Sequence, residues 1–112
     1  MTDMTVERLA ESCGFRTLAL PDGERTVSGA YVGDLLSWVM GRASADNVWI
    51  TIMSNINVVA VASLSDVSCV ILAEGVVPEE DVVKTALAKG VNLLVSDSPI
   101  YETALKLSAL PI

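Results

Sequence analysis

Apolar side chains recur along this chain at two spacings, one typical of helices and one typical of buried strands. Residues 5–13 carry apolar side chains at intervals of three and four positions, and Gly14 follows as a helix stop, so this segment is predicted to be a helix. Residues 17–20 are expected to form a short strand. A turn at 21–24, where proline and glycine preset the backbone, leads into a second extended segment over 25–31. We expect these two extended segments to pair.

Strands and helices alternate from residue 47 onward, and each connection is long enough for a right-handed crossover between parallel strands. The fold class predicted is α/β: a three-layer α/β/α domain with a small, mainly parallel sheet, spanning residues 1–112 as a single domain. The elements expected after the first turn are a helix over 32–40, a strand over 47–52, a helix over 55–64, a strand over 68–73, a helix that begins at 78 and is stopped by Gly90, a strand over 92–95 and a helix over 98–107.

The helix over 55–64 is apolar almost all round, a pattern that indicates burial on both sides. A central position in the fold would explain this pattern, and so would additional burial by self-association. Composition agrees with a layered core, since 52% of the residues are hydrophobic but only 4% are aromatic. The core is therefore expected to be aliphatic, with strands covered on both faces.

The chain has a formal net charge of −7 and no cluster of lysine or arginine. Binding to nucleic acid or to an anionic membrane surface requires such cationic side chains, so neither is expected. The first residues lack the basic flank and apolar stretch of a signal peptide, and no apolar run approaches the ~18 residues needed to span a membrane. We expect a cytoplasmic protein.

The side chains needed for common catalytic sites are missing from the sequence. There is no histidine and no phosphate-binding loop of the form GxxxxGK[ST], so histidine-based triads and nucleotide hydrolysis are not expected. Cys13 and Cys69 stand in apolar settings without a neighbouring base, which indicates buried thiols and not nucleophiles. We predict no catalytic residue, no metal site and no cofactor.

Ligands bind beyond the carboxyl ends of the strands in open α/β sheets, which directs attention to the loops at 51–57, 74–75 and 96–98. An alternative interpretation is that Ser54 and Ser98 cap helices and that Asn57 satisfies a turn. The ligand-binding candidates are Thr51, Ser54, Asn55, Asn57, Ser96 and Asp97.

Trp38 follows the turn at 33–34 on a predicted helix, where its side chain is expected to face outward. Exposed aromatic side chains are common at contacts between subunits, although a place in the core fits the pattern equally well. The candidate interface residues are Tyr31, Asp34, Leu35 and Trp38.

Residues 24–37 resemble the DRTGG domain family, and the similarity continues through 39–41, 49–52 and 57–62. The motif that gives the family its name is altered here, because Ser28-Gly29-Ala30 stands where many members have Thr-Gly-Gly. Glu24-Arg25 supplies the acidic-basic pair. In the loop at 54–57, Asn55 replaces a histidine of close relatives.

The resemblance implies a DRTGG-like fold and a regulatory role. Such domains occur alone or as regulatory inserts, for example between nucleotide-sensing CBS domains and the catalytic part of certain pyrophosphatases, where they support dimerisation. They are similar to the N-terminal domain of HPr kinase/phosphorylase, whose kinase chemistry lies in a separate domain with a phosphate loop.

We therefore expect a non-enzymatic regulatory or assembly module that acts as a homodimer, with a partner enzyme as a further candidate partner. The alternative is a small-ligand sensor that binds a nucleotide or another phosphorylated metabolite at the carboxyl ends of the strands. A third hypothesis is an enzyme whose Asp, Ser or Lys groups meet across a dimer interface.

Overall fold

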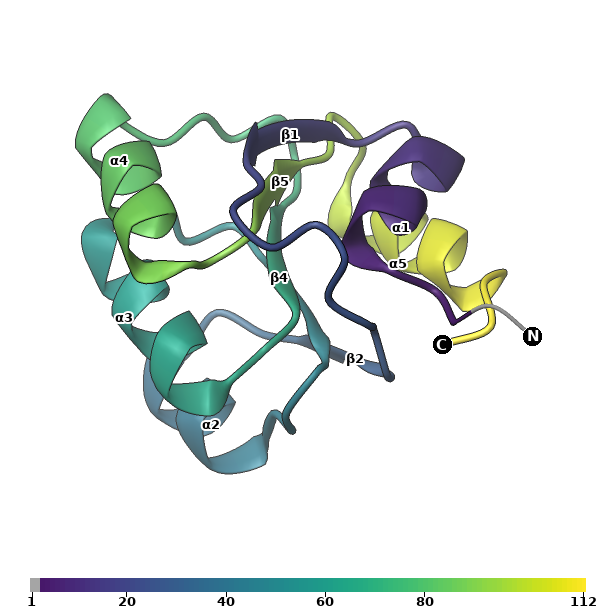
Figure 1. The fold of residues 1–112 in the computed structure, drawn as a ribbon, viewed down its shortest axis with the longest axis horizontal. Coiled ribbons are helices and arrows are strands. Elements are labelled where there is room, and N and C mark those ends of the chain that lie inside the picture. Colours follow the sequence, from purple (N-terminus) through teal and green to yellow (C-terminus); the bar gives the residue numbers. More distant parts are fainter. Residues whose placement is uncertain (1–2) are drawn as a thin grey trace.

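A five-stranded sheet in the order β1-β5-β4-β3-β2 runs through the centre of the molecule (Figure 1). The computed structural model describes residues 3–112. Strands β2 to β5 are parallel to one another, and only β1 is antiparallel, to β5. The strands are β1 (Arg16–Ala19), β2 (Ala30–Val32), β3 (Val48–Thr51), β4 (Cys69–Leu72) and β5 (Leu93–Val95).

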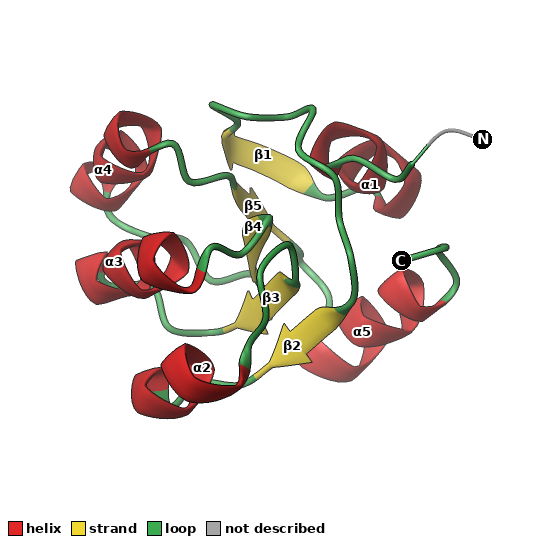
Figure 2. Ribbon diagram, turned by 60° about the horizontal axis from the view of Figure 1, so that its bottom comes forward, coloured by secondary structure: helices red, strands yellow, loops and turns green. Residues whose placement is uncertain are grey.

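Helices cover both faces of this sheet, which confirms the predicted three-layer α/β/α fold (Figure 2). One face carries α2 (Leu36–Arg42), α3 (Ile56–Ser65) and α4 (Glu80–Lys89) side by side, and the other carries α1 (Val6–Cys13) and α5 (Ile100–Ser108). The chain adds β2, β3, β4 and β5 in one direction across the sheet. Right-handed crossovers therefore place all three connecting helices on the same face.

Alternate residues of each central strand point to opposite helical layers, so the strands are apolar throughout. Trp49 and Val70 pack in the core beneath α2, α3 and α4, whereas Val48, Ile50 and Ile71 pack toward α1 and α5. All four residues of β3 and all four of β4 are buried. This is the burial pattern of a parallel sheet covered on both faces.

Helix ends agree with the predictions that rest on local capping chemistry. The hydroxyl of Thr5 accepts a hydrogen bond from the Arg8 N–H at 3.2 Å, and Gly14, with φ of 72°, ends α1. Gly90 ends α4 in the same left-handed conformation. The predicted start of α4 at residue 78 is two positions early, since the helix begins at Glu80.

The predicted pairing of the first two extended segments is wrong. β1 pairs with β5 and β2 pairs with β3, and only Ala30–Val32 of the expected 25–31 segment is a strand. The preceding backbone binds the N-terminal end of α1 instead: Val6 N–H donates to Arg25 C=O at 3.0 Å, and Glu7 N–H donates to Gly23 C=O at 2.9 Å. The first N–H groups of a helix have no acceptor within the helix, so those of Val6 and Glu7 need acceptors elsewhere. The carbonyl groups of Arg25 and Gly23 provide them.

The apolar helix α3 is buried on one face only, so the prediction of burial on both sides is wrong. Val58 and Ala62 are fully buried, whereas Leu64 is 74% exposed. Its position in the middle of the α2–α3–α4 layer accounts for the burial that it does have. Within residues 3–112, no helix combines the length and the apolar character needed to cross a membrane.

Candidate functional site

Thr51, the first candidate ligand residue, ends β3 and is fully buried. Its hydroxyl donates to the Asp34 carboxylate at 2.7 Å and accepts from the Met53 N–H at 3.2 Å. The same Asp34 oxygen accepts from the Ile52 N–H at 3.0 Å. Asp34 and Thr51 therefore fix the turn after β2 to the end of β3. This fixed turn explains why α2 begins at Leu36, later than the predicted 32.

Ser96 and Asp97, which follow β5, also bind other parts of the chain. The buried Ser96 hydroxyl lies 2.7 Å from the Thr103 hydroxyl and accepts from the Ser98 N–H at 3.2 Å. The exposed Asp97 carboxylate pairs with Arg16 of β1 at 3.0 Å. These contacts close the 96–98 loop onto α5 and β1, away from the cleft described below.

The loop before α3 follows the capping interpretation, with a different capping residue. Asn55 is the N-cap, and its side-chain oxygen accepts from the Asn57 N–H at 2.9 Å. Ser54 does not serve as the cap, because the helix begins one residue later than a cap at that position allows. Ser98 is likewise not the cap of α5, where Pro99 holds that position.

A cleft of about 470 Å³ separates the start of α3 from the start of α4. It brings together Ser54 and Asn55 of the predicted set, but neither Thr51 nor the 96–98 loop. Carboxylates of Glu79 and Asp81 line it, and none of its lining residues is a lysine or an arginine. The described part of the chain contains no group of three metal-ligating side chains. The full lining is Ser54, Asn55, Ile56, Val77, Glu79, Asp81 and Val82.

The four candidate interface residues do lie together, beside β2 and the start of α2. Trp38 is 52% exposed and Leu35 is 57% exposed, while Tyr31 is half-buried. The Arg42 guanidinium lies 3.7 Å from the centre of the Trp38 ring, a cation–π contact. A second cleft, of about 540 Å³, is lined by Tyr31, Val32, Gly33, Asp34, Leu35, Trp38 and Arg42.

The two tryptophans differ in exposure, since Trp38 lies at the surface and Trp49 lies in the core. Trp49 is fully buried in β3. Its indole N–H donates to the Gly33 C=O at 2.8 Å and so holds the chain just after β2. Of the two positions that the sequence allowed for Trp38, outward or in the core, the structure shows the outward one.

Arg25 of the family-like motif has a structural role that the sequence did not reveal. Its guanidinium binds the carboxylates of Asp46 at 2.9 Å and Asp66 at 2.8 Å, and also the Asp66 C=O at 2.6 Å. Burial lowers the pKa of Arg25, but the hydrogen bonds to the two aspartates outweigh burial and raise this pKa above its ordinary value. Arg25 therefore joins three loops, and no local pattern could indicate partners 21 and 41 residues away.

Gly29, in the same motif, has a backbone conformation that other residues rarely adopt. Its φ is +71°, and a Cβ atom there would lie 3.1 Å from the side-chain nitrogen of Asn47. That nitrogen donates to the Ser28 C=O at 2.8 Å. The glycine thus lets the chain turn closely past Asn47 into β2.

Both cysteines stay protonated at neutral pH. Burial raises the pKa of the Cys69 thiol to about 12, against smaller lowering effects from Ser68 and Arg25. Burial also raises the pKa of Cys13, although Lys106 acts in the opposite direction. A protonated thiol is a poor nucleophile and a poor metal ligand.

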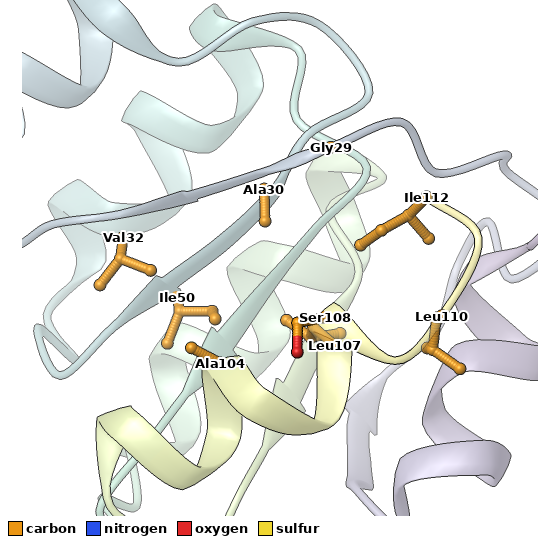
Figure 3. Close-up of a pocket in the computed structure, with 9 residues that line it drawn as sticks. All are labelled: Gly29, Ala30, Val32, Ile50, Ala104, Leu107, Ser108, Leu110 and Ile112. Carbon is orange, nitrogen blue, oxygen red and sulfur yellow. The ribbon is translucent and has the colours of Figure 1, made fainter.

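The sequence did not predict a third cavity, an apolar slot of about 260 Å³ between the sheet and α5 (Figure 3). It exists because two helices, α1 and α5, cover a face that carries five strands, which leaves the edge strand β2 uncovered on this face. The only polar side chain in its lining, Ser108, donates to the Leu105 C=O of its own helix at 2.7 Å. The slot is lined by Gly29, Ala30, Val32, Ile50, Ala104, Leu107, Ser108, Leu110 and Ile112.

Comparisons with known proteins identify the fold. No protein-family model matches the chain, and no curated protein matches it. Among solved structures, it is similar to the CBS and DRTGG domains of the regulatory region of Clostridium perfringens pyrophosphatase, in complex with the activator diadenosine tetraphosphate. The TM-score is 0.70 at 12% identity, over 96% of this chain and 47% of that chain. The fold is therefore DRTGG-like, and this chain spans about half the length of that structure.

Proposed function

We propose that this chain is a regulatory or assembly module without catalytic activity, which acts as a homodimer. The observation that carries the proposal is the apolar surface formed by Val32, Leu35 and Trp38 beside the open edge of the sheet. Large apolar side chains gathered at one edge are typical of protein–protein contacts. A DRTGG-like fold shared with the regulatory region of a pyrophosphatase supports a regulatory role, with a partner enzyme as its target.

The polar groups at the carboxyl ends of the strands support the absence of catalysis. Thr51 binds Asp34, and Ser96 binds Thr103, so these hydroxyls are engaged in structural hydrogen bonds. Both thiols are protonated at neutral pH. The Thr51 hydroxyl does face the Asp34 carboxylate, but Thr51 is fully buried and a substrate cannot reach it.

Sedimentation velocity from low to high micromolar concentration tests the homodimer. We expect the unmodified chain to sediment as a dimer and the Trp38→Glu variant as a monomer, because a buried interface does not accept an unpaired carboxylate. Leu64→Glu is the matched control, since Leu64 is 74% exposed on α3, which contributes no residue to this cleft, and this variant should remain dimeric. A monomer at every concentration of the unmodified chain would contradict the proposal.

A second candidate function, ligand sensing, is favoured by the cleft of about 470 Å³ between α3 and α4. The carboxylates of Glu79 and Asp81 restrict what can bind there. A nucleotide or a sugar phosphate would place negative charge against them, whereas a neutral or cationic polar molecule would not. If this cleft binds a ligand, we expect that ligand to be a neutral or cationic polar molecule.

Thermal unfolding with two panels of compounds tests this second function. Adenine nucleotides, including diadenosine tetraphosphate, form one panel, and nucleosides and polyamines form the other. We expect stabilisation only in the second panel, and loss of this stabilisation in the Asp81→Asn variant. Stabilisation by nucleotides alone would indicate a binding site outside this cleft. No change in unfolding temperature with either panel would contradict ligand sensing at this cleft.

A further inference from the structure

Strand β2 lies at one edge of the sheet and is hydrogen-bonded on one side only. Gly29 C=O accepts from the Val48 N–H at 3.0 Å, and the Gly33 N–H donates to the Ile50 C=O at 3.2 Å, so the odd-numbered residues face β3. Because backbone polar groups alternate in direction along a strand, those of Ala30 and Val32 point away from β3. No other part of residues 3–112 forms a hydrogen bond with them. β2 therefore presents an open row of donors and acceptors.

The opposite edge of the sheet, β1, has the features that prevent such pairing. Arg16 places a charge there and binds Asp97 at 3.0 Å. The strand register shifts between Thr17 and Ala19, and Pro21 follows shortly afterwards. Charged side chains, irregular register and proline are the devices that proteins use to block edge-to-edge association. β2 has none of the three.

We infer that β2 pairs antiparallel with β2 of a second copy of this chain, across a two-fold axis, so that one sheet runs through both copies. This inference rests on the proposed homodimer and specifies its interface. In the register that the free groups allow, Ala30 of each copy exchanges two backbone hydrogen bonds with Val32 of the other. Tyr31 then lies opposite Tyr31 of the second copy, as a pair without backbone hydrogen bonds between its members.

The distribution of charge allows a second copy of this chain at this edge, although it opposes one elsewhere on the surface. The chain carries a net charge of −7, so two copies repel each other over most of their surface. Residues 26–33, however, contain no charged side chain. In the inferred register Asp34 lies opposite Ser28 of the second copy, so no two carboxylates face each other across the new pair. The edge is thus a place where two acidic copies can approach.

Apolar side chains flank the edge on both faces of the sheet. On the α5 face, Ala30 and Val32 point into the slot, and Val32 is 47% exposed (Figure 3). On the α2 face, Tyr31 packs against the core, with the exposed Trp38 and Leu35 in the adjoining cleft. Strand pairing would cover these side chains from both sides. Cross-strand pairs of aromatic and β-branched residues of this kind stabilise antiparallel sheets.

Two lysine variants, one at each edge, test where association occurs. Val32→Lys places a charge in the middle of the inferred interface. In sedimentation experiments, we expect this substitution to raise the dissociation constant of the dimer at least tenfold. Thr17→Lys, at the exposed and already protected β1 edge, is the matched control and should remain dimeric. Circular dichroism and thermal unfolding establish that both variants are folded. A dimeric Val32→Lys variant would overturn the inference.

A disulfide tests the register itself. Cα atoms of an antiparallel pair without hydrogen bonds lie about 4.5 Å apart, within the range that a disulfide spans. Tyr31→Cys, combined with Cys13→Ser, should therefore form a covalent dimer on mild oxidation, whereas Leu64→Cys in the same background should not. Cys69 is fully buried and stays in both variants.

The outcomes separate this inference from the proposed homodimer. A wild-type dimer, no covalent dimer of the Tyr31→Cys chain and a dimeric Val32→Lys variant would together show a homodimer with another interface. A monomeric wild-type chain would contradict both proposals. A covalent dimer through position 31, together with a monomeric Val32→Lys variant, would support both.

Discussion

The two edge strands of the sheet, β1 and β2, differ in how well they are suited to pair with a further strand. At β1, an arginine bound to Asp97 and a shift in register leave a strand that is poorly suited to further pairing. At β2, uncharged residues present free backbone groups between the apolar slot beside α5 and the cleft beside α2. The sheet is therefore protected against further strand pairing at β1 and open to such pairing at β2. The residues that hold β2 in place are therefore also the residues that shape the open edge.

The largest effect is expected from Trp49→Ala, which removes the side chain that anchors the end of β2. Trp49 is fully buried and donates to the Gly33 C=O. Removing a buried tryptophan typically lowers the free energy of unfolding by about 3–5 kcal/mol. Chemical denaturation measures this loss. Trp49→Phe, which keeps most of the ring volume, should lose much less, and an equal loss would contradict the packing role.

A smaller loss is expected from Arg25→Ala, which separates the three loops behind β2. Hydrogen bonds to charged groups contribute about 1.5–3 kcal/mol, and the partners here are partly exposed, so we expect a loss of about 2 kcal/mol. Arg25→Lys keeps the charge but cannot form the forked contact, and should recover part of the loss. Equal stability of Arg25→Ala and the wild-type chain in urea denaturation would contradict this role.

Gly29→Ala tests the turn that leads into the open edge, and Gly41→Ala is its matched control. At Gly29, a positive φ and a close Asn47 nitrogen oppose a Cβ atom, so we expect a loss of about 1–2 kcal/mol. At Gly41, inside α2 and with no atom within 4 Å of an added Cβ, alanine should instead stabilise by up to about 1 kcal/mol. Thermal unfolding of the two variants should therefore shift in opposite directions.

The smallest effect on stability is expected from Arg16→Ala at the protected edge. Both partners of its ion pair are largely exposed, and such pairs contribute about 0–1 kcal/mol. The irregular register and Pro21 remain, so this variant should not gain a new mode of association. Light scattering checks this. Higher oligomers of Arg16→Ala would show that the charge alone protects β1.

Local chemistry explains which parts of the fold could be predicted from the sequence. The helices α1 and α4 end at Gly14 and Gly90, and a cap of this kind needs only the residues beside it. The buried strands β3 and β4 are continuous apolar runs, which a sheet covered on both faces requires. The expected pairing of 17–20 with 25–31 is wrong because hydrogen bonds to the start of α1 hold residues 23–27.

Among the candidate site residues too, the sequence indicated where each residue lies but not which distant residue it binds. Polar residues at the ends of strands were correctly located, but the side chains of Thr51 and Ser96 form hydrogen bonds within the fold. The partners that occupy them, Asp34 and Thr103, come from other elements, and no spacing in the sequence indicates these pairs. For Trp38 the sequence pattern fitted an outward position and a core position equally well, and the structure places its side chain outward.

The sequence by itself determined the alternation of strands and helices, the capped helix ends and the aliphatic core. Each of these depends on residues within a few positions of one another. Only the tertiary structure decided that Arg25 binds Asp46 and Asp66, that β1 pairs with β5, and that β2 is left at an open edge. Those features depend on which distant segments the folded chain brings together, and local propensities carry no information about that choice.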